Sequence, residues 1–213
     1  AFAYLQHTPS PRTFMTSKFQ RYADDEITDP SIRMPRQILA TSTNQYSIDI
    51  VVSRWEKHLV EPSAAHEKYP WAAGLVMGIP VPSWHRPVVW NVGQKTRFIV
   101  AVWSGADLGS YMTNGWCASG GGRATAENSD NLIDGLQRLH SLEEYLLDRL
   151  AVPDAQGQPR VWSEVGNRER KRFLSTVFTH THVSSDDEVL LRKTYDLYAM
   201  GVASRTNDQR AVR

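Results

Sequence analysis

The sequence predicts an α+β domain, in which a mixed or antiparallel sheet carries C-terminal helices packed on it. Val, Ile, Phe and Trp are concentrated in residues 74–81 and 88–102, which we interpret as two buried strands. Helical spacing of apolar residues and capping side chains mark two later segments, residues 128–150 and 185–202. We therefore expect a sheet built from residues 46–102, with these two helices packed against it.

An irregular arm precedes the predicted sheet. Prolines interrupt residues 1–37, where basic side chains alternate with Phe14, Phe19 and Tyr22. Basic groups neutralise phosphates and aromatic rings stack on unpaired bases, so this mixture is typical of nucleic-acid contact. The alternative is that the rings pack under the sheet while the charges face water. The basic candidates in this arm are Arg12, Lys18 and Arg21.

The first predicted strand covers residues 46–52, which alternate in polarity and then become apolar. Between the two runs described above, Pro82 and Pro87 enclose a short insert that cannot donate ladder hydrogen bonds at either proline. We expect a stiff loop there. It would present the ring of Trp84 for stacking, beside two groups that can carry positive charge, His85 and Arg86.

Two further places offer positive charge or bare backbone. If residues 88–102 form a strand, Lys95 and Arg97 lie on the same side of it, because side chains alternate with a period of two. Farther on, three consecutive glycines, 120–122, precede Arg123. Unhindered amides and a guanidinium are good donors to a phosphate oxygen, although a glycine run is more often a linker.

A basic helix is predicted near residue 170. Its first half carries Arg168, Arg170, Lys171 and Arg172, and apolar residues follow. The alternative is a solvated helix face whose charges pair with neighbouring glutamates. We predict that the loop at Trp84, the face with Lys95 and Arg97, and this helix join into one basic surface.

The overall charge requires any basic surface to be local. The 213 residues contain 24 basic and 23 acidic side chains, for a formal net charge of +1. The single cysteine, Cys117, excludes an internal disulfide framework and a zinc site built from several cysteines. One cysteine also fits a reducing compartment, so we expect a cytoplasmic protein. Since no apolar run reaches the length of a membrane span, we expect no membrane partner.

A pair of histidines is the first enzyme-like pattern. His180 and His182 could ligate a metal together with Asp186 or Asp187. The neighbouring patterns place the pair at a helix-to-helix junction, where a surface turn is the simpler interpretation. A metal-dependent nuclease or hydrolase using the region around His180 and His182 therefore stays as an alternative function.

A loose nuclease pattern is the second. Pro153 and Asp154, followed by Glu169 and Lys171, match a proline-aspartate pair with a later acid-x-lysine. That chemistry needs the acid and the lysine on a core strand to hold Mg²⁺, whereas these residues are predicted to lie in a linker and a basic helix. No serine or cysteine lies in a recognisable nucleophile motif. We therefore expect no catalytic residue, no bound metal and no cofactor.

The central region resembles a known family. The run Pro-Trp-Ala-Ala-Gly-Leu-Val-Met-Gly-Ile at 70–79, followed by Gly-Gln-Lys-Thr-Arg-Phe at 93–98, is similar to the small proteins in the large-subunit position of type IV CRISPR effector complexes. The Leu- and Tyr-rich segment 184–202 resembles their closing helix. The resemblance implies a non-catalytic subunit that contacts guide RNA and the short duplex motif beside a target, with Lys95 and Arg97 as contacts.

These observations lead to one predicted organisation and three functions. Residues 1–122 form an aromatic-rich sheet region with a basic N-terminal arm, and residues 123–213 form a helical region of the same compact domain. The leading function is a non-catalytic nucleic-acid-binding subunit of a multi-protein assembly, with RNA or DNA and other subunits as partners. The alternatives are the metal-dependent enzyme described above and a structural or viral assembly protein with aromatic interaction loops.

Overall fold

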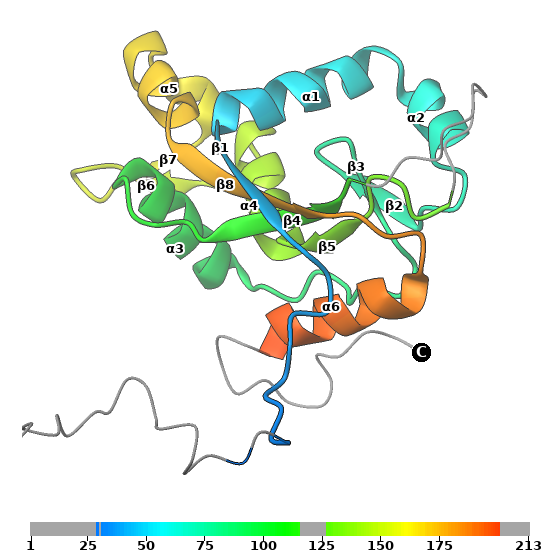
Figure 1. Cartoon of the computed structure of the whole chain (residues 1–213). Helices are drawn as coiled ribbons and strands as arrows, with labels where there is room; N and C mark the ends of the chain where they lie inside the picture. The colour runs from blue at the N-terminus through cyan, green and yellow to red at the C-terminus, as the bar shows by residue number, and fades with distance from the viewer. Residues whose placement is uncertain (1–28, 30, 116–126, 201–213) are drawn as a thin grey trace, which may run out of the picture. The chain divides into compact units, whose positions relative to one another are not determined.

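The central sheet is mixed and has four strands. The computed structural model describes residues 29, 31–115 and 127–200, and all its helices and strands belong to the unit that begins at Gln37. The strand order is β1–β8–β4–β5, in which β8 runs antiparallel to β1 and parallel to β4, and β5 runs antiparallel to β4 (Figure 1). The strands are β1 (Ser42–Ser47), β4 (Ser110–Asn114), β5 (Leu132–Asp134) and β8 (Val177–Val183). The predicted α+β class, with C-terminal helices on a mixed sheet, is confirmed.

Helices and two small hairpins surround this sheet. The hairpins pair β2 (Gly74–Val76) with β3 (Ile79–Val81), and β6 (Val152–Pro153) with β7 (Pro159–Arg160). The helices are α1 (Ile48–Val60), α2 (Pro62–Lys68), α3 (Val92–Trp103), α4 (Leu136–Leu146), α5 (Asn167–Leu174) and α6 (Glu188–Met200), with a 3-10 turn η1 (Trp162–Glu164) before α5.

The two faces of the sheet carry separate hydrophobic clusters. Neighbouring residues of a strand point to opposite faces, and Tyr111 of β4 belongs to one cluster while Met112 belongs to the other. The larger cluster contains apolar side chains of α1, α3, α4 and α5. The smaller one lies under α6, which Figure 1 shows on the opposite side of the sheet from α1. The sheet therefore separates α5 from α6.

The predicted strand at residues 88–102 is wrong, because most of this segment forms α3. Asn91 caps the helix: its side chain accepts from the backbone of Gln94, whose side chain accepts from the backbone of Asn91. Phe98, Ile99 and Val102 then bury one face of the helix. The β-branched composition favoured a strand, but capping and packing determine the structure here.

The other predicted elements were right in part. Residues 74–81 form the β2–β3 hairpin instead of a single strand, because the chain turns at Met77 and Gly78, both with positive φ. The strand predicted for 46–52 ends at Ser47, where α1 follows. The helix predicted for 128–150 contains β5 before α4. The last predicted helix is confirmed as α6, and Asp187 accepts hydrogen bonds from the first-turn amides of Val189 and Leu190.

Candidate nucleic-acid interface

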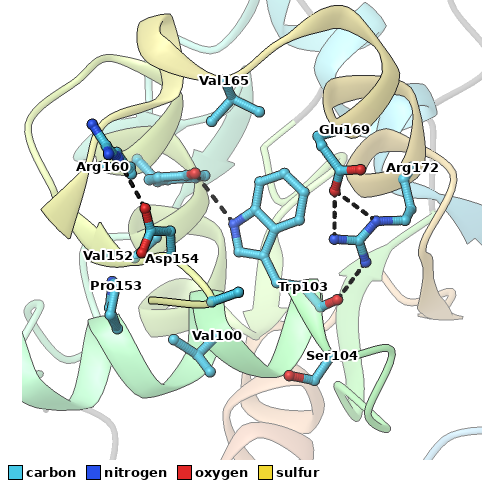
Figure 2. A pocket seen from close by; sticks show the side chains of 12 residues that line it. Val100, Trp103, Ser104, Val152, Pro153, Asp154, Arg160, Val165, Glu169 and Arg172 are labelled. Atoms are coloured by element: carbon cyan, nitrogen blue, oxygen red, sulfur yellow. Dashed lines mark hydrogen bonds and ion pairs between the residues drawn. The ribbon is translucent and has the colours of Figure 1, made fainter. Parts of the chain in front are cut away.

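A cavity of about 420 Å³ lies between α3, α4, the β6–β7 hairpin and α5 (Figure 2). We call it the Trp103 cavity, because Trp103, the last residue of α3, stands at its centre in that view. Its apolar walls come from Val100 and Trp103 of α3, Tyr145 of α4, Val152 of β6 and Val165. Distant parts of the chain thus build one concave, largely apolar site.

Aromatic packing fixes the position of Trp103. Its indole ring lies 4.7 Å from the ring of Phe173, measured between centroids, and its Nε1 donates to the hydroxyl of Tyr145 at 3.2 Å. Phe173 and Tyr145 are each only 1% exposed. Since the partners of the indole belong to the core, the wall that it forms is rigid.

Two ion pairs stand on opposite sides of the cavity (Figure 2). Arg160 donates through Nε to Asp154 at 3.0 Å, and this bond lowers the pKa of the Asp154 carboxyl. Arg172 donates to Glu169 through Nε at 2.9 Å and through Nη2 at 2.7 Å. The rim therefore combines guanidinium donors with carboxylate acceptors, above apolar walls.

Helix α5 carries the basic residues predicted for it. Some of their side chains are exposed without a partner in the described part of the chain, and others are bonded within the protein. Arg168 and Lys171 are exposed, and among the residues that the structure describes neither side chain has a hydrogen bond or an ion pair. Arg170 donates to the carbonyl oxygens of Val165 and Ser163, and its guanidinium lies 5.2 Å from the centroid of a Trp162 ring. Of the four basic residues of α5, Arg168 and Lys171 are therefore the ones most available to a ligand.

Lys95 and Arg97 lie on α3, so the prediction that they share one side of a strand is wrong. Two residues apart, side chains of a helix point in different directions. Lys95 donates to Glu144 of α4 at 2.6 Å and is 13% exposed, whereas Arg97 is exposed. Lys95 therefore joins two helices, and Arg97 faces solvent.

The prediction that the loop at residues 82–87 presents an aromatic ring is also wrong. Trp84 is 2% exposed and belongs to the cluster under α6, where its ring lies 5.7 Å from that of Tyr195. His85 is buried as well, and this burial lowers its pKa, which disfavours a charged ring at neutral pH. Arg86 is half-buried. Because the sheet separates this cluster from α5, Trp84 and His85 do not join α5 in one basic surface.

Four candidates lie outside the described residues: Arg12, Lys18, Arg21 and Arg123. Their role in nucleic-acid contact stays a prediction. Cys117 also lies outside the described residues.

The histidine pair lies on β8, so its predicted place at a helix-to-helix junction is wrong. His180 shares a hydrogen bond of 2.9 Å with Thr113, and its ring stacks on Tyr111 with centroids 4.6 Å apart. The rings of His180 and His182 are 5.8 Å apart. Burial, with the charges of His182 and Arg54, lowers the pKa of His180 to about 4. Within the described ranges, no group of three or more His, Cys, Asp or Glu is arranged to hold a metal ion.

The residues of the nuclease pattern come closer together than the sequence indicates. Pro153, Asp154 and Glu169 all line the Trp103 cavity. However, Asp154 also accepts from the backbone amides of Gln156 and Gln158, and its other oxygen accepts from Arg160. Asp154 therefore holds the turn between β6 and β7.

A second basic region lies around a hollow of about 440 Å³ at α1 and α2. Two acids line it as well, and one of them, Asp130, pairs with Lys68 at 3.5 Å and accepts from the hydroxyl of Tyr69. Its charges are thus more mixed than those of α5. The basic side chains that line it are Arg54, Lys57, His58 and Lys68.

Sequence reasoning missed Trp103 and Arg160 as site residues. The capping box at Asn91 and Gln94 was a usable signal, because a helix beginning there places Trp103 one turn after Val100, on the same face. For Arg160 there was no local signal. Its place at the cavity depends on a hairpin packed near α3, and no short-range pattern encodes that contact.

Comparisons with known proteins give no relative: no protein-family model, no curated protein and no solved structure matches the chain. The resemblance to the type IV CRISPR subunits therefore stays a prediction. A search of the described residues finds no helix with the length and apolar content needed to span a membrane.

Proposed function

We propose that the chain is a non-catalytic nucleic-acid-binding subunit, and that it binds through α5 and the adjoining rim of the Trp103 cavity. One observation carries the proposal. Arg168 and Lys171 are exposed on α5, and two other residues of this helix, Glu169 and Arg172, line the Trp103 cavity with its aromatic wall. Cations that track phosphates beside aromatic rings that accept bases are the usual features of single-strand binding surfaces.

The charge distribution supports this surface. Helix α5 contains four basic residues and one acidic residue, Asn167 to Leu174, so its side chains carry a net charge of 4 − 1 = +3. The whole chain has a formal net charge of only +1. Positive charge is thus concentrated on one short helix, where it would attract phosphates locally.

The position of α5 is well defined, which favours binding. Phe173 anchors the helix in the core, and Arg172 ties it to the end of α3 by donating to the carbonyl oxygen of Trp103 at 2.7 Å. Cations on an anchored helix lose less conformational freedom on binding than cations on a flexible segment.

A salt series tests the proposal. Removing two phosphate contacts with Arg168→Gln and Lys171→Gln should reduce the slope of log affinity against log salt by about 1.4 to 1.8, since each contact contributes about 0.7 to 0.9. Affinity for RNA and DNA oligonucleotides would be measured by fluorescence anisotropy. The matched control is Lys57→Gln with Lys193→Gln, which removes two exposed lysines from α1 and α6.

The control also tests the alternative surface, because Lys57 lines the hollow at α1 and α2. If the control pair lowers the slope and the α5 pair does not, binding occurs at α1 or α6 and the proposal for α5 is wrong. If neither pair changes affinity or slope, neither cationic pair contacts phosphate, and the assembly-protein alternative is preferred.

Partnership with other protein subunits has separate support. Three valines within five positions of the chain are exposed: Val88 by 37%, Val89 by 57% and Val92 by 68%. Exposed apolar side chains so close together are suited to contact with another subunit. We expect Val89→Asp with Val92→Asp to reduce association of the chain with other subunits, measured by sedimentation. Val189→Asp on α6 should leave this association unchanged.

A further inference from the structure

The walls of the Trp103 cavity suit a flat ring. Its volume of about 420 Å³ is within the range of roughly 300 to 1,000 Å³ typical of small-ligand sites. Trp103, Val100 and Val165 present aromatic and branched apolar surface to it. A planar aromatic group that enters edgewise would pack against these side chains, as bases pack on aromatic side chains in proteins that bind unpaired strands.

The rim offers both donors and acceptors that are still available. Arg160 uses only Nε, and within the described residues its two terminal nitrogens make no hydrogen bond. Across the cavity, Oε2 of Glu169 receives both bonds from Arg172, while Oε1 of Glu169 has no partner in the described part of the chain. A nucleobase has donors and acceptors on one edge, so it matches this rim better than a purely aliphatic ligand does.

The cations of α5 lie where the backbone of such a nucleotide would emerge. Glu169 and Arg172, three residues apart, line the cavity. Residues three and four apart are neighbours on a helix, so Arg168 is next to both Lys171 and Arg172. Arg168 and Lys171 therefore lie beside the cavity-facing pair on the exposed surface of α5 and would meet the phosphates next to an inserted base.

We infer that the Trp103 cavity receives an unpaired nucleobase, so that the ligand bound at α5 is single-stranded. This inference rests on the proposed function and specifies its substrate class. A base inside a duplex is stacked and paired, and extracting it costs the free energy of unstacking and unpairing. Single strands expose their bases without that cost, and the cavity therefore selects them.

Blocking the cavity without deleting a contact gives a direct test. Ala155 lines the mouth from the turn between β6 and β7 and is exposed, so Ala155→Trp should fill the space that the base needs. Ser104→Trp blocks it from the opposite element, the end of α3. The control is Gln156→Trp, at the next position of the same turn, which is exposed and does not line the cavity.

Three ligands of equal length would be compared by anisotropy: a thymidine oligonucleotide, the same sugar-phosphate chain without bases, and a duplex. We expect the single strand to bind about tenfold more tightly than either of the others, consistent with one stacked base. Ala155→Trp and Ser104→Trp should each remove that preference and leave binding of the abasic chain unchanged. Gln156→Trp should behave like the wild type, and thermal unfolding would establish that each variant folds.

The outcomes separate the inference from the proposed function. If the single strand, the abasic chain and the duplex bind equally, or if blocking the cavity changes nothing, the base-binding inference is wrong while binding through α5 stands. If none of the three ligands binds the wild-type chain, the proposed function itself is wrong. A blocking variant that unfolds is replaced by the other one, because the two change different elements.

Discussion

The guanidinium of Arg172 lies over the indole of Trp103, 5.0 Å from the ring centroid, and donates a hydrogen bond to the carbonyl oxygen of the same residue. One side chain therefore binds the end of α3 in two ways. It also pairs with Glu169 on its own helix. Through these contacts Arg172 holds α5, the cavity rim and the wall formed by Trp103 in one arrangement.

We expect Arg172→Ala to lower the free energy of unfolding by about 1 to 2 kcal/mol, through loss of the cation–π contact and of the hydrogen bond to the carbonyl. Lys171→Ala is the matched control, because this neighbour is exposed and should change stability by less than about 0.5 kcal/mol. Urea denaturation followed by circular dichroism measures both. Equal effects of the two substitutions would contradict a structural role for Arg172.

A second prediction concerns Gln137, a buried residue in the first turn of α4. Its side-chain oxygen accepts from the amides of Val89 and Trp90, and its nitrogen donates to the carbonyl oxygen of Pro87. Gln137→Leu leaves three backbone groups of this loop without their partner, so we expect a loss of about 2 to 4 kcal/mol.

The matched control for Gln137 is Gln94→Leu, which removes only one bond of the α3 capping box, the one from the Asn91 amide, and should cost about 1 kcal/mol. Urea denaturation would compare the two variants with the wild type. A loss at Gln137 no larger than the loss at Gln94 would mean that water replaces the lost partner, and that the loop does not depend on α4.

The elements that were predicted correctly have local signals. For α6 these are a capping-box pattern, Ser185 with Glu188, and apolar residues at helical spacing. The helix and its buried Leu191 and Tyr195 are as predicted, but Asp187 caps the helix in place of Ser185. Helix α3 also had a local signal, the Asn91 and Gln94 cap, but its β-branched residues favoured a strand. Composition alone thus misassigned a segment that spacing and capping describe correctly.

The sheet and the cavity depend on contacts between distant segments. In the centre of the sheet, Tyr111 pairs with His180 in parallel strands. No turn joins these strands, so the sequence contains no hairpin signal for the pairing. The basic first half of α5 is a local pattern, so it could be predicted. The Trp103 cavity depends on contacts between distant segments, so it could not. Trp84 was predicted to be exposed because nothing near it in sequence shows that α6 covers it.

A third prediction concerns Gly135, which precedes α4 with φ of +104°. A Cβ at this position would lie 2.6 Å from Cβ of Tyr111, closer than two carbons can approach. We expect Gly135→Ala to cost at least about 2 kcal/mol, since backbone strain and overpacking add. Gly105→Ala is the control: its φ is +67°, but no atom lies within 4 Å of the added Cβ.

Thermal and urea unfolding of the two glycine variants would separate strain from crowding. The Gly105 variant reports the cost of positive φ alone, expected to be about 1 kcal/mol. If Gly135→Ala costs no more than Gly105→Ala, then β4 shifts to admit the methyl group, and the close packing of α4 on Tyr111 is not required for stability.

The last prediction concerns the pH dependence of stability, which follows from the position of His180 in the sheet. The ring stacks between Tyr111, at 4.6 Å, and Tyr46, at 5.7 Å. Burial is the main cause that lowers its pKa, and His182 and Arg54 add to it. The groups that face or act on this ring are Tyr46, Tyr111, Thr113, His182 and Arg54.

The pKa of His180 is about 4 in the folded chain, against an ordinary value of 6.5. Between these values the unfolded chain binds a proton that the folded chain does not, so the free energy of unfolding falls as the pH decreases from 6.5 to 4. We expect His180 to contribute roughly 1 to 2 kcal/mol to this fall, less than the full shift implies, because the ring is only half-buried and solvent screens its charge.

His180→Gln should remove that part of the fall. Burial also lowers the pKa of His85, which leaves a residual slope in both proteins, so the quantity to measure is the difference between their urea-unfolding curves at pH 7 and pH 4.5. Parallel pH profiles for wild type and variant would show that protonation of His180 is not coupled to folding.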